Sequence, residues 1–454
     1  MSLVSDAVRQ SPARGALSVR LSPYVVFVGT SVLCFLRLPS AARQTLWAED
    51  GTRFTSDAVN AGARAVFDPF GGYLHVVSRL LAWFTTSLVS FPRYALVLNA
   101  LACLVTGVVA AVVFSASAFA IRSPWLRAWL AVLTVLLPVV GQEVVGSVAN
   151  LHWFFLWGAF WVLLNRPASR GGAVAATGFL LAATLSEIQT ALLLPVAVLV
   201  GVRAVRRGEG VPARLVAFGL GLSAQLVATL AVPRVNHRAW VGVVNLAQDA
   251  ARQVLMPLWS GNELVLRSWL SGGGWWPAVA CGLPVLFAGG YLAARAGRAS
   301  RLLAAALLLL ALVAFTTAVS LNATREVALA KGGSVSQEVF LSRYGVVPQL
   351  ALLAVVALAA QVALDRRDRV VAAASGVLLV ALLVPGLLSF HVPTNRRDPA
   401  NDWPSQSASA ARTCRADGAP SVALQVSPDR RWKLTVPCRR VVTTHGWTMW
   451  PGHG

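Results

Sequence analysis

Long runs of apolar residues, separated by short polar turns, dominate the pattern of this chain. A transmembrane helix needs about 20 mostly apolar residues, and windows of that size predict eleven spans. The predicted spans are 22–38, 93–120, 124–141, 151–165, 171–186, 187–203, 212–233, 274–295, 302–320, 344–364 and 369–389. The stretch 171–203 leaves two alternatives open, a broken hairpin or one long buried helix. The pattern predicts an all-α polytopic membrane protein.

The polar stretch after the first span has helical patterns of its own. Segment 53–67 repeats apolar or small residues every four positions, which predicts an amphipathic helix on the outer membrane surface. Segment 72–91 is apolar but holds His75 and Arg79. We therefore expect it to be a half-buried or re-entrant element and do not count it as a span.

Composition favours lipid over water as the solvent of this chain. Hydrophobic residues make up 56% of the sequence and charged residues only 13%, whereas soluble domains carry about 25% charged residues. The net charge of +21 would indicate nucleic-acid binding in a soluble protein. Here the arginines stand mostly at the ends of apolar runs, and no nucleic-acid motif is present. We expect a lipid bilayer and no nucleic acid among the partners.

The arginines also predict the orientation of the chain. Short turns rich in Lys and Arg lie on the cytoplasmic side. With the arginine-rich turns on that side, all but four of the 18 acidic residues lie on the outer face. We expect a multi-pass protein of the plasma membrane. It divides into a cytoplasmic N-terminal segment 1–21, a transmembrane domain 22–389 that contains the outer loop 39–92, and an extracytoplasmic C-terminal tail 390–454.

Two cysteines in the tail fit an outer location. Cys414 and Cys438 can form a disulfide in an oxidising compartment. The bridge would close a loop of about 25 residues and contribute roughly 3 kcal/mol in the chain-entropy model. Strand-like runs at 421–426 and 432–436 flank the turn signal Ser427-Pro428-Asp429. We expect a small disulfide-closed β element, with two unpaired thiols in a flexible tail as the alternative.

Adjacent carboxylates follow the first span in the sequence Trp47-Ala48-Glu49-Asp50-Gly51. A partly desolvated carboxylate has a raised pKa and can act as a base. Two together can also bind a divalent cation through their oxygens. The alternative is a solvated loop acid that caps a helix.

His75 and Arg79 are four residues apart and share one face of a helix. As a cationic pair at the bilayer edge they could hold a phosphate. The alternative is a snorkelling arginine beside a hydrogen-bonded core histidine.

Four more positions place polar side chains at the ends of apolar runs: Glu143, His152, Glu187 and the dipeptide Arg343-Tyr344. Ionisable residues at membrane depth are functional candidates. The planar fork of an arginine suits phosphate, although Arg343 and Tyr344 could equally be an interfacial anchor. If the spans pack as one bundle, the first three should converge on the outer side.

These motifs together resemble the C-type (GT-C) glycosyltransferase superfamily of membrane enzymes. The resemblance rests on Trp47–Gly51, on the Gly72–His75 turn with Arg79, and on Ser342-Arg343-Tyr344 before a late span. In topology it covers most of the chain, whereas the motifs themselves are short.

The resemblance implies an inverting transfer of a hexose or pentose from a polyprenyl-phosphate donor on the outer face. The acceptor would be an envelope glycan, lipid or protein. Asp50 or Glu49 would take the proton of the acceptor hydroxyl, and His75, Arg79 and Arg343 would stabilise the departing polyprenyl phosphate. Glu143, His152, Glu187 and Tyr344 would bind substrate. The resemblance leaves open a divalent cation at Glu49 and Asp50.

Three other functions remain as alternatives. A transporter or flippase would move a lipid-linked saccharide through the same cavity, although such proteins typically have internal repeats, and we detect no strong repeat. A ligase or polymerase of surface polysaccharide would also act on lipid-linked sugars. A scaffold of an envelope-assembly complex would have no chemistry.

Overall fold

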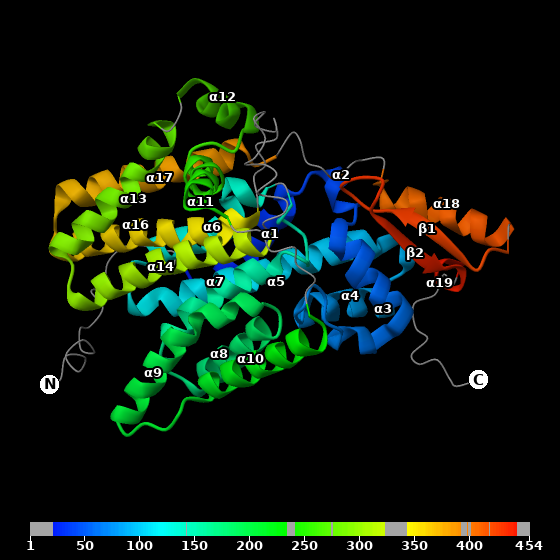
Figure 1. Ribbon diagram of the computed structural model, residues 1–454, viewed down its shortest axis with the longest axis horizontal. Coiled ribbons are helices and arrows are strands. Elements are labelled where there is room, and N and C mark those ends of the chain that lie inside the picture. Colours follow the sequence, from blue (N-terminus) through cyan, green and yellow to red (C-terminus); the bar gives the residue numbers. More distant parts are fainter. Residues whose placement is uncertain are drawn as a thin grey trace.

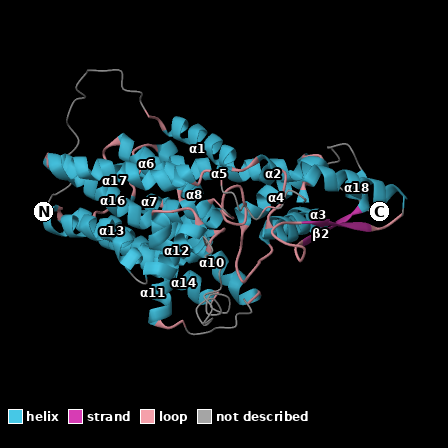
Figure 2. Ribbon diagram, turned by 90° about the horizontal axis from the view of Figure 1, so that it is seen from above, coloured by secondary structure: helices cyan, strands magenta, loops and turns pink. Residues whose placement is uncertain are grey.

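The computed structural model describes residues 21–141, 143–233, 241–273, 276–322, 343–391, 397, 401–416 and 418–442. These residues are mostly helical, with one small two-stranded sheet near the C-terminal end (Figures 1 and 2). The elements are α1 (Pro23–Arg37), α2 (Ser40–Arg43), α3 (Ser56–Ala61), α4 (Val76–Leu88), α5 (Tyr94–Ala116), α6 (Pro124–Leu136), α7 (Leu151–Leu164), α8 (Arg170–Thr184), α9 (Leu194–Arg206), α10 (Ala213–Ala231), α11 (Val243–Ala250), α12 (Glu263–Gly273), α13 (Trp276–Arg295), α14 (Arg298–Leu321), α16 (Val346–Arg366), α17 (Arg369–Leu388), α18 (Trp403–Ala416), β1 (Ser421–Gln425), β2 (Lys433–Pro437) and α19 (Cys438–Val442).

Seven helical stretches of the described chain are long and apolar enough to cross a membrane. They are Phe91–Phe119, Ile188–Arg206, Ala213–Ala231, Trp276–Arg295, Arg298–Leu321, Arg343–Arg366 and Arg369–Leu388. Large apolar side chains on the outside of these helices stay exposed, Phe287 and Leu388 among them. Because such surface would be unfavourable in water, the fold is that of a largely helical multi-pass membrane protein.

Four predicted spans form shorter helices than the membrane thickness requires. Spans 22–38, 124–141, 151–165 and 171–186 become α1, α6, α7 and α8, of 13 to 15 residues each. At 1.5 Å per residue such a helix covers roughly 20 Å, whereas the apolar layer is about 30 Å thick. The stretch 171–203 is a broken hairpin, since the chain turns at Leu185–Glu187 between α8 and the next helical segment.

Two helices form the interior of the bundle. In α16 the most apolar window is 94% buried, and α6, α7, α13, α14 and α17 surround this helix. In α7 every residue from Leu151 to Leu163 is buried, which agrees with its apolar character on all sides. Both helices begin at the same end of the bundle, so the first residues of α7 and the residues just before α16 lie close together.

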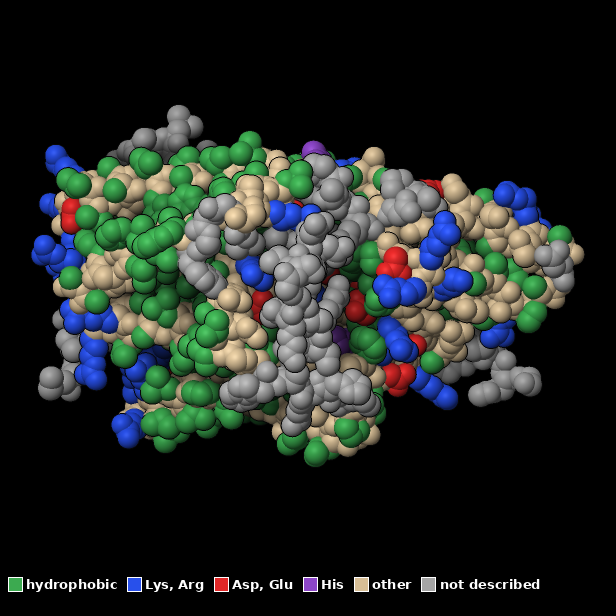
Figure 3. All heavy atoms as spheres, turned by 45° about the horizontal axis from the view of Figure 1, so that its top comes forward, with side chains coloured by type: hydrophobic (Ala, Val, Ile, Leu, Met, Phe, Trp, Pro, Cys, Tyr) green, Lys and Arg blue, Asp and Glu red, His purple; other side chains and the backbone are tan. Residues whose placement is uncertain are grey.

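Basic turns mark the opposite end of the bundle, which we call the arginine end. There the Arg122 guanidinium lies 2.6 Å from the Asp365 carboxylate, and Arg166 forms an ion pair with Glu209. These ion pairs join the turn before α6 to the end of α16, and the turn after α7 to the turn after α9. Figure 3 shows Lys and Arg side chains gathered at the left, where Figure 1 places the α13–α14 and α16–α17 turns. The other end, which carries α18 and the sheet, is the tail end.

The segment 53–67 does not form the single amphipathic helix that its pattern predicts. It divides into a π-helical turn (Asp50–Thr55), α3, and a 3₁₀ stretch (Gly62–Phe67). The break falls at Gly62, whose φ of 62° lies in the left-handed region that favours glycine. All three parts of this segment contact α4. The segment 72–91 forms α4, at the tail end beside α3.

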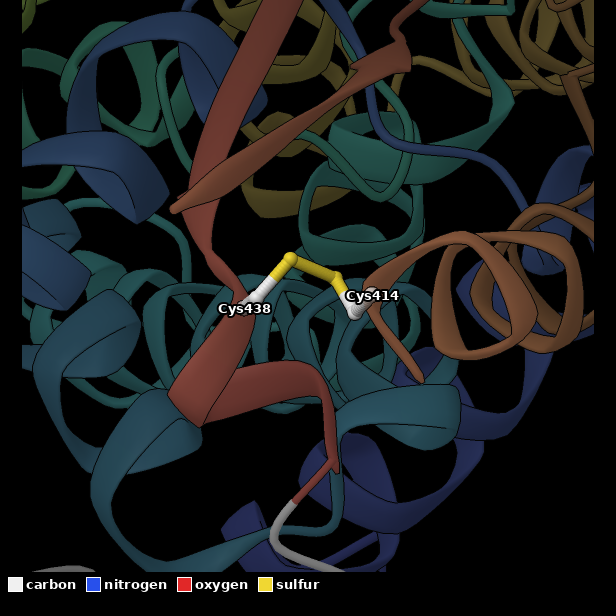
Figure 4. Close-up of a disulfide and its surroundings, with 2 residues drawn as sticks. All are labelled: Cys414 and Cys438. Carbon is white, nitrogen blue, oxygen red and sulfur yellow. A yellow bond between two sulfur atoms is a disulfide. The ribbon is translucent and has the colours of Figure 1, made fainter. Parts of the chain in front are cut away.

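The tail packs a helix against a hairpin. Strands β1 and β2 are antiparallel, with Ala423 opposite Thr435, and α18 lies beside them. A disulfide joins Cys414 at the end of α18 to Cys438 after β2, with 5.4 Å between their Cα atoms (Figure 4). The bridge therefore ties the helix to the hairpin.

Trp403, the first residue of α18, anchors the tail to the bundle. Its side chain is fully buried and packs against Phe91 and Tyr94. The indole Nε1–H donates to the Phe91 carbonyl at 2.7 Å, and the backbone N–H donates to the Gln44 carbonyl at 2.8 Å. The tail is thus fixed to the start of α5 and to the first outer loop.

We expect Trp403→Ala to loosen the tail from the bundle, because replacing a buried tryptophan costs roughly 3–5 kcal/mol. Limited proteolysis of the purified protein would show faster cleavage within the tail, with the bundle intact. Trp125→Ala, at a largely exposed tryptophan, is the matched control. Equal cleavage rates of the two variants would contradict this anchoring role.

Candidate functional site

The first outer loop is held in place by the tail. The Ala48 N–H donates to the Ser427 carbonyl at 2.6 Å, and the Ser427 N–H donates to the Leu46 carbonyl at 3.1 Å. Gly51 allows this contact, since a Cβ there would lie 2.7 Å from a methyl group of Val426. The loop then enters the π-helical turn, a geometry frequent at functional sites.

A cavity of about 240 Å3 opens at the tail end of the bundle. Segments far apart in the sequence form its walls: the first outer loop, the turn before α4, the start of α7, the α8–α9 turn, the end of α14 and the start of α16. Its lining residues are Glu49, Phe54, Phe70, Gly71, Tyr73, His75, Ala149, His152, Trp153, Glu187, Ile188, Gln189, Leu321, Asn322, Arg343 and Tyr344. The structure thus brings together six of the residues that the sequence singled out.

Glu49 and Asp50 occupy different places relative to this cavity. Glu49 lines it, and one carboxylate oxygen, Oε2, is buried without a hydrogen-bond partner among the described residues. Asp50 lies behind the wall, where its Oδ1 accepts from the Ala149 N–H at 2.7 Å and from the Ser147 hydroxyl at 3.2 Å. Asp50 is not among the residues that line the cavity, although its other oxygen, Oδ2, is also buried without a hydrogen-bond partner among the described residues. Which of the two carboxylates acts as the base stays a prediction.

Burial sets the protonation of Asp50. Loss of hydration raises the pKa of this carboxyl to about 7, against the lowering effect of the Arg397 guanidinium and of the Ala149 N–H. Arg397 is itself buried, and it donates to the Thr45 and Val145 carbonyls and to the Asn99 side chain. This arginine therefore joins the tail, the first outer loop and the segment before α7.

His75 and Arg79 do not form the predicted phosphate-binding pair. Arg79 is 2% exposed; its guanidinium bonds Asp57 at 2.9 Å and donates to the Ala65 carbonyl at 3.0 Å. His75 lines the cavity, but burial, together with the charges of His152 and Arg79, lowers the pKa of its imidazole well below 6.5. A neutral ring beside an arginine that already has a counter-charge is a poor anion site.

Among the described residues, Arg343 is the Lys or Arg side chain that lines the cavity. It lies before α16, and its side chain keeps 25% of its surface exposed. Its nearest carboxylate atom, Oε2 of Glu143, is 3.9 Å from the guanidinium, a long separation for an ion pair. Tyr344 packs under the guanidinium and against Trp153. Glu143 therefore positions Arg343, and its Oε1 also accepts from the Arg343 backbone N–H at 3.2 Å.

His152 and Glu187 meet on another wall. Nδ1 of His152 is hydrogen-bonded to Oε2 of Glu187, whose Oε1 accepts from the Gln189 N–H at 2.6 Å. Glu187 is almost fully buried. The three predicted residues Glu143, His152 and Glu187 are thus at one end of the bundle, each in a polar contact.

Gln225 on α10 holds two of these walls together. Its amide nitrogen donates to the Leu74 and Thr184 carbonyls, and its amide oxygen accepts from the Leu74 N–H at 2.8 Å. Leu74 precedes His75, and Thr184 lies three residues before Glu187. Sequence reasoning missed this residue, although an amide within an apolar helix was the available signal.

An aromatic wall was also not foreseen. The rings of Phe54, Phe70 and Tyr73 surround His75, with the Tyr73 centroid 4.0 Å from the imidazole centroid. Aromatic faces of this kind pack against the apolar faces of sugar rings. No pattern in the sequence distinguished these residues from ordinary interfacial aromatics.

Within the described part of the chain, no group of three or more His, Cys, Asp or Glu side chains is arranged to hold a metal ion. The two adjacent carboxylates serve different places, Glu49 at the cavity and Asp50 behind it. Comparison with known proteins gives no family: no family model matches the chain, and no curated protein or solved structure is significantly similar to it.

Asp50 predicts a pH-dependent stability. Its folded-state pKa of about 7 is above the ordinary 3.8, so the protonated carboxyl favours folding at low pH, and this advantage is lost as the pH rises through about 7. We expect the melting temperature of the wild type to fall relative to Asp50→Asn between about pH 4 and pH 7, by several degrees. Asp68→Asn, at an exposed carboxylate, is the control, and parallel curves for all three proteins would refute the assignment.

Proposed function

We propose that this chain is a membrane glycosyltransferase that moves a sugar from a polyprenyl-phosphate donor to an envelope glycan, lipid or protein. The observation that carries the proposal is the cavity in which Glu49 and Arg343 occur together. Glycosyl transfer from a phosphate needs a base for the acceptor and a cation for the leaving anion. The aromatic wall around His75 offers a surface for the sugar.

In the proposed reaction Glu49 takes the proton of the acceptor hydroxyl while the acceptor oxygen attacks the anomeric carbon with inversion. The bond between that carbon and the phosphate oxygen breaks, and its electron pair stays on the polyprenyl phosphate. Arg343 stabilises the charge that develops there. Asp50 supports the reaction indirectly, because its hydrogen bond to the Ala149 N–H fixes the loop that carries Glu49.

The proposal includes a topology. We infer that the seven long apolar stretches, together with the four shorter helices α1, α6, α7 and α8 and the apolar residues that flank them, are the eleven spans of a plasma-membrane protein. The arginine end would face the cytoplasm, and the cavity and the tail would face outward. A disulfide in the tail is in keeping with an oxidising compartment.

The direct test is transfer by the purified protein in lipid, supplied with a polyprenyl-phosphate sugar and envelope acceptors. We expect Glu49→Gln to reduce the release of polyprenyl phosphate by at least about 10²-fold, the usual contribution of a general base. Glu209→Gln, at the arginine end, should keep the wild-type rate and the same melting temperature. Full activity of Glu49→Gln would remove the proposed base, and movement of donor across the bilayer without bond formation would favour a transporter.

Sidedness has its own measurement. We expect a membrane-impermeant maleimide, added to intact cells, to label Ser409→Cys in α18 and to leave Gly210→Cys in the α9–α10 turn unlabelled; both positions are exposed. The unpaired thiols of Cys34, Cys103 and Cys281 are buried and should contribute little background. Labelling of Gly210→Cys alone would invert the topology and place the cavity on the wrong side for this reaction.

A further inference from the structure

The proposed reaction assigns no role to the His152–Glu187 pair, although both side chains line the cavity. Glu187 is fixed by the Gln189 N–H, and it bonds Nδ1 of His152. The second ring nitrogen, Nε2, is then the one available to a ligand. A buried carboxylate that orients an imidazole and stabilises its protonated form is an arrangement that enzymes use for proton transfer.

The neighbours of His152 place it beside Arg343, the residue proposed to stabilise the departing phosphate. Trp153, the next residue, packs edge-on against Tyr344 at 5.9 Å between centroids, and Tyr344 adjoins Arg343. His152 and the cation that would hold the phosphate therefore occupy adjoining walls.

The ionisable groups that face His152 come from several elements. Besides Glu187 from the α8–α9 turn, they are His75 and Tyr73 from the turn before α4, Glu49 from the first outer loop, and Arg343 with Tyr344 from the start of α16. His75 is neutral, and Arg343 has Glu143 beside it. Glu187 is the carboxylate in direct hydrogen-bond contact with the imidazole.

We propose that His152, oriented by Glu187, donates a proton to the departing polyprenyl phosphate. This inference rests on the proposed function and adds a second proton transfer to it. His152 is the catalytic acid, and Glu187 is its positioning residue.

The step balances as follows. The acceptor O–H gives its proton to Glu49, and the acceptor oxygen forms a bond to the anomeric carbon. The bond from that carbon to the phosphate oxygen breaks, and the oxygen keeps the electron pair and receives the proton from Nε2 of His152. Polyprenyl phosphate leaves as a monoanion, with one proton gained by Glu49 and one lost by His152, and solvent restores both.

Proton donation suits this leaving group. The second pKa of a phosphate monoester is about 6, so the departing dianion is basic enough to accept a proton from a donor within hydrogen-bond reach. Acid–base catalysis is most effective when the donor's pKa is near the working pH. Arg343 alone would neutralise one of the two negative charges, and a proton from His152 removes the other.

The test uses the full chain in lipid, with the wild-type transfer rate measured first. We expect His152→Gln to lower kcat by about 10²-fold or more, with the KM for the donor little changed. The wild-type kcat should decline at alkaline pH as the imidazolium is lost, and the residual rate of His152→Gln should lack this decline. Glu187→Gln should keep part of the rate with a displaced alkaline decline, which a purely structural residue would not cause.

His391→Gln, at an exposed histidine after α17, is the matched control and should reproduce the wild-type profile. Glu187→Gln also serves if His152→Gln does not fold, as judged by its melting temperature. One outcome would overturn this inference alone. In it, the wild type transfers sugar and Glu49→Gln does not, while His152→Gln and Glu187→Gln keep the wild-type rate and its alkaline decline. Absence of any transfer by the wild type would instead overturn the proposed function.

Discussion

The arrangement of the site depends on one buried carboxyl group. Asp50 is 1% exposed, and burial of a polar group is costly unless it is hydrogen-bonded. Its Oδ1 accepts hydrogen bonds from the Ala149 N–H and the Ser147 hydroxyl. Those partners belong to the segment that leads into α7. One hydrogen-bonded group thus holds the first outer loop against the start of a central helix, with Glu49 on one wall of the cavity and His152 on another.

Arg79 and Arg343, both predicted to bind phosphate, differ in burial and in how closely a carboxylate holds them. The Arg79 guanidinium is 2.9 Å from the Asp57 carboxylate, and the side chain is 2% exposed. This ion pair therefore stabilises the fold around α3 and α4. Arg343 is held more loosely, 3.9 Å from Glu143, with a quarter of its side chain exposed. A phosphate can therefore reach the guanidinium of Arg343 from the cavity. The guanidinium of Arg79 is buried and already bound by Asp57 and the Ala65 carbonyl, so taking it from these partners would be costly.

The C-terminal tail also holds the first outer loop in place. Trp403 and Arg397 reach from the tail into contacts with α5 and with the loop that precedes Glu49. Ser427 pairs with that loop as a short strand would. The disulfide between Cys414 and Cys438 keeps α18 and the hairpin together. The loop that carries the proposed base is therefore braced from the bundle on one side and from the tail on the other.

The sequence by itself determined the solvent of the chain, the positions of its long apolar helices and the polar residues at their ends. These follow from local composition, because a run of apolar residues has few stable alternatives to a buried or lipid-facing helix. It also located both strands of the tail within one residue or so. Only the tertiary structure decided which of two adjacent carboxylates reaches the cavity, which of two arginines keeps an exposed guanidinium, and that Gln225 and Arg397 join the walls. Such outcomes depend on hydrogen bonds and counter-charges supplied by other segments, from 22 residues away for Arg79 and Asp57 to 298 residues away for Arg397 and Asn99. Local patterns carry no information about those partners.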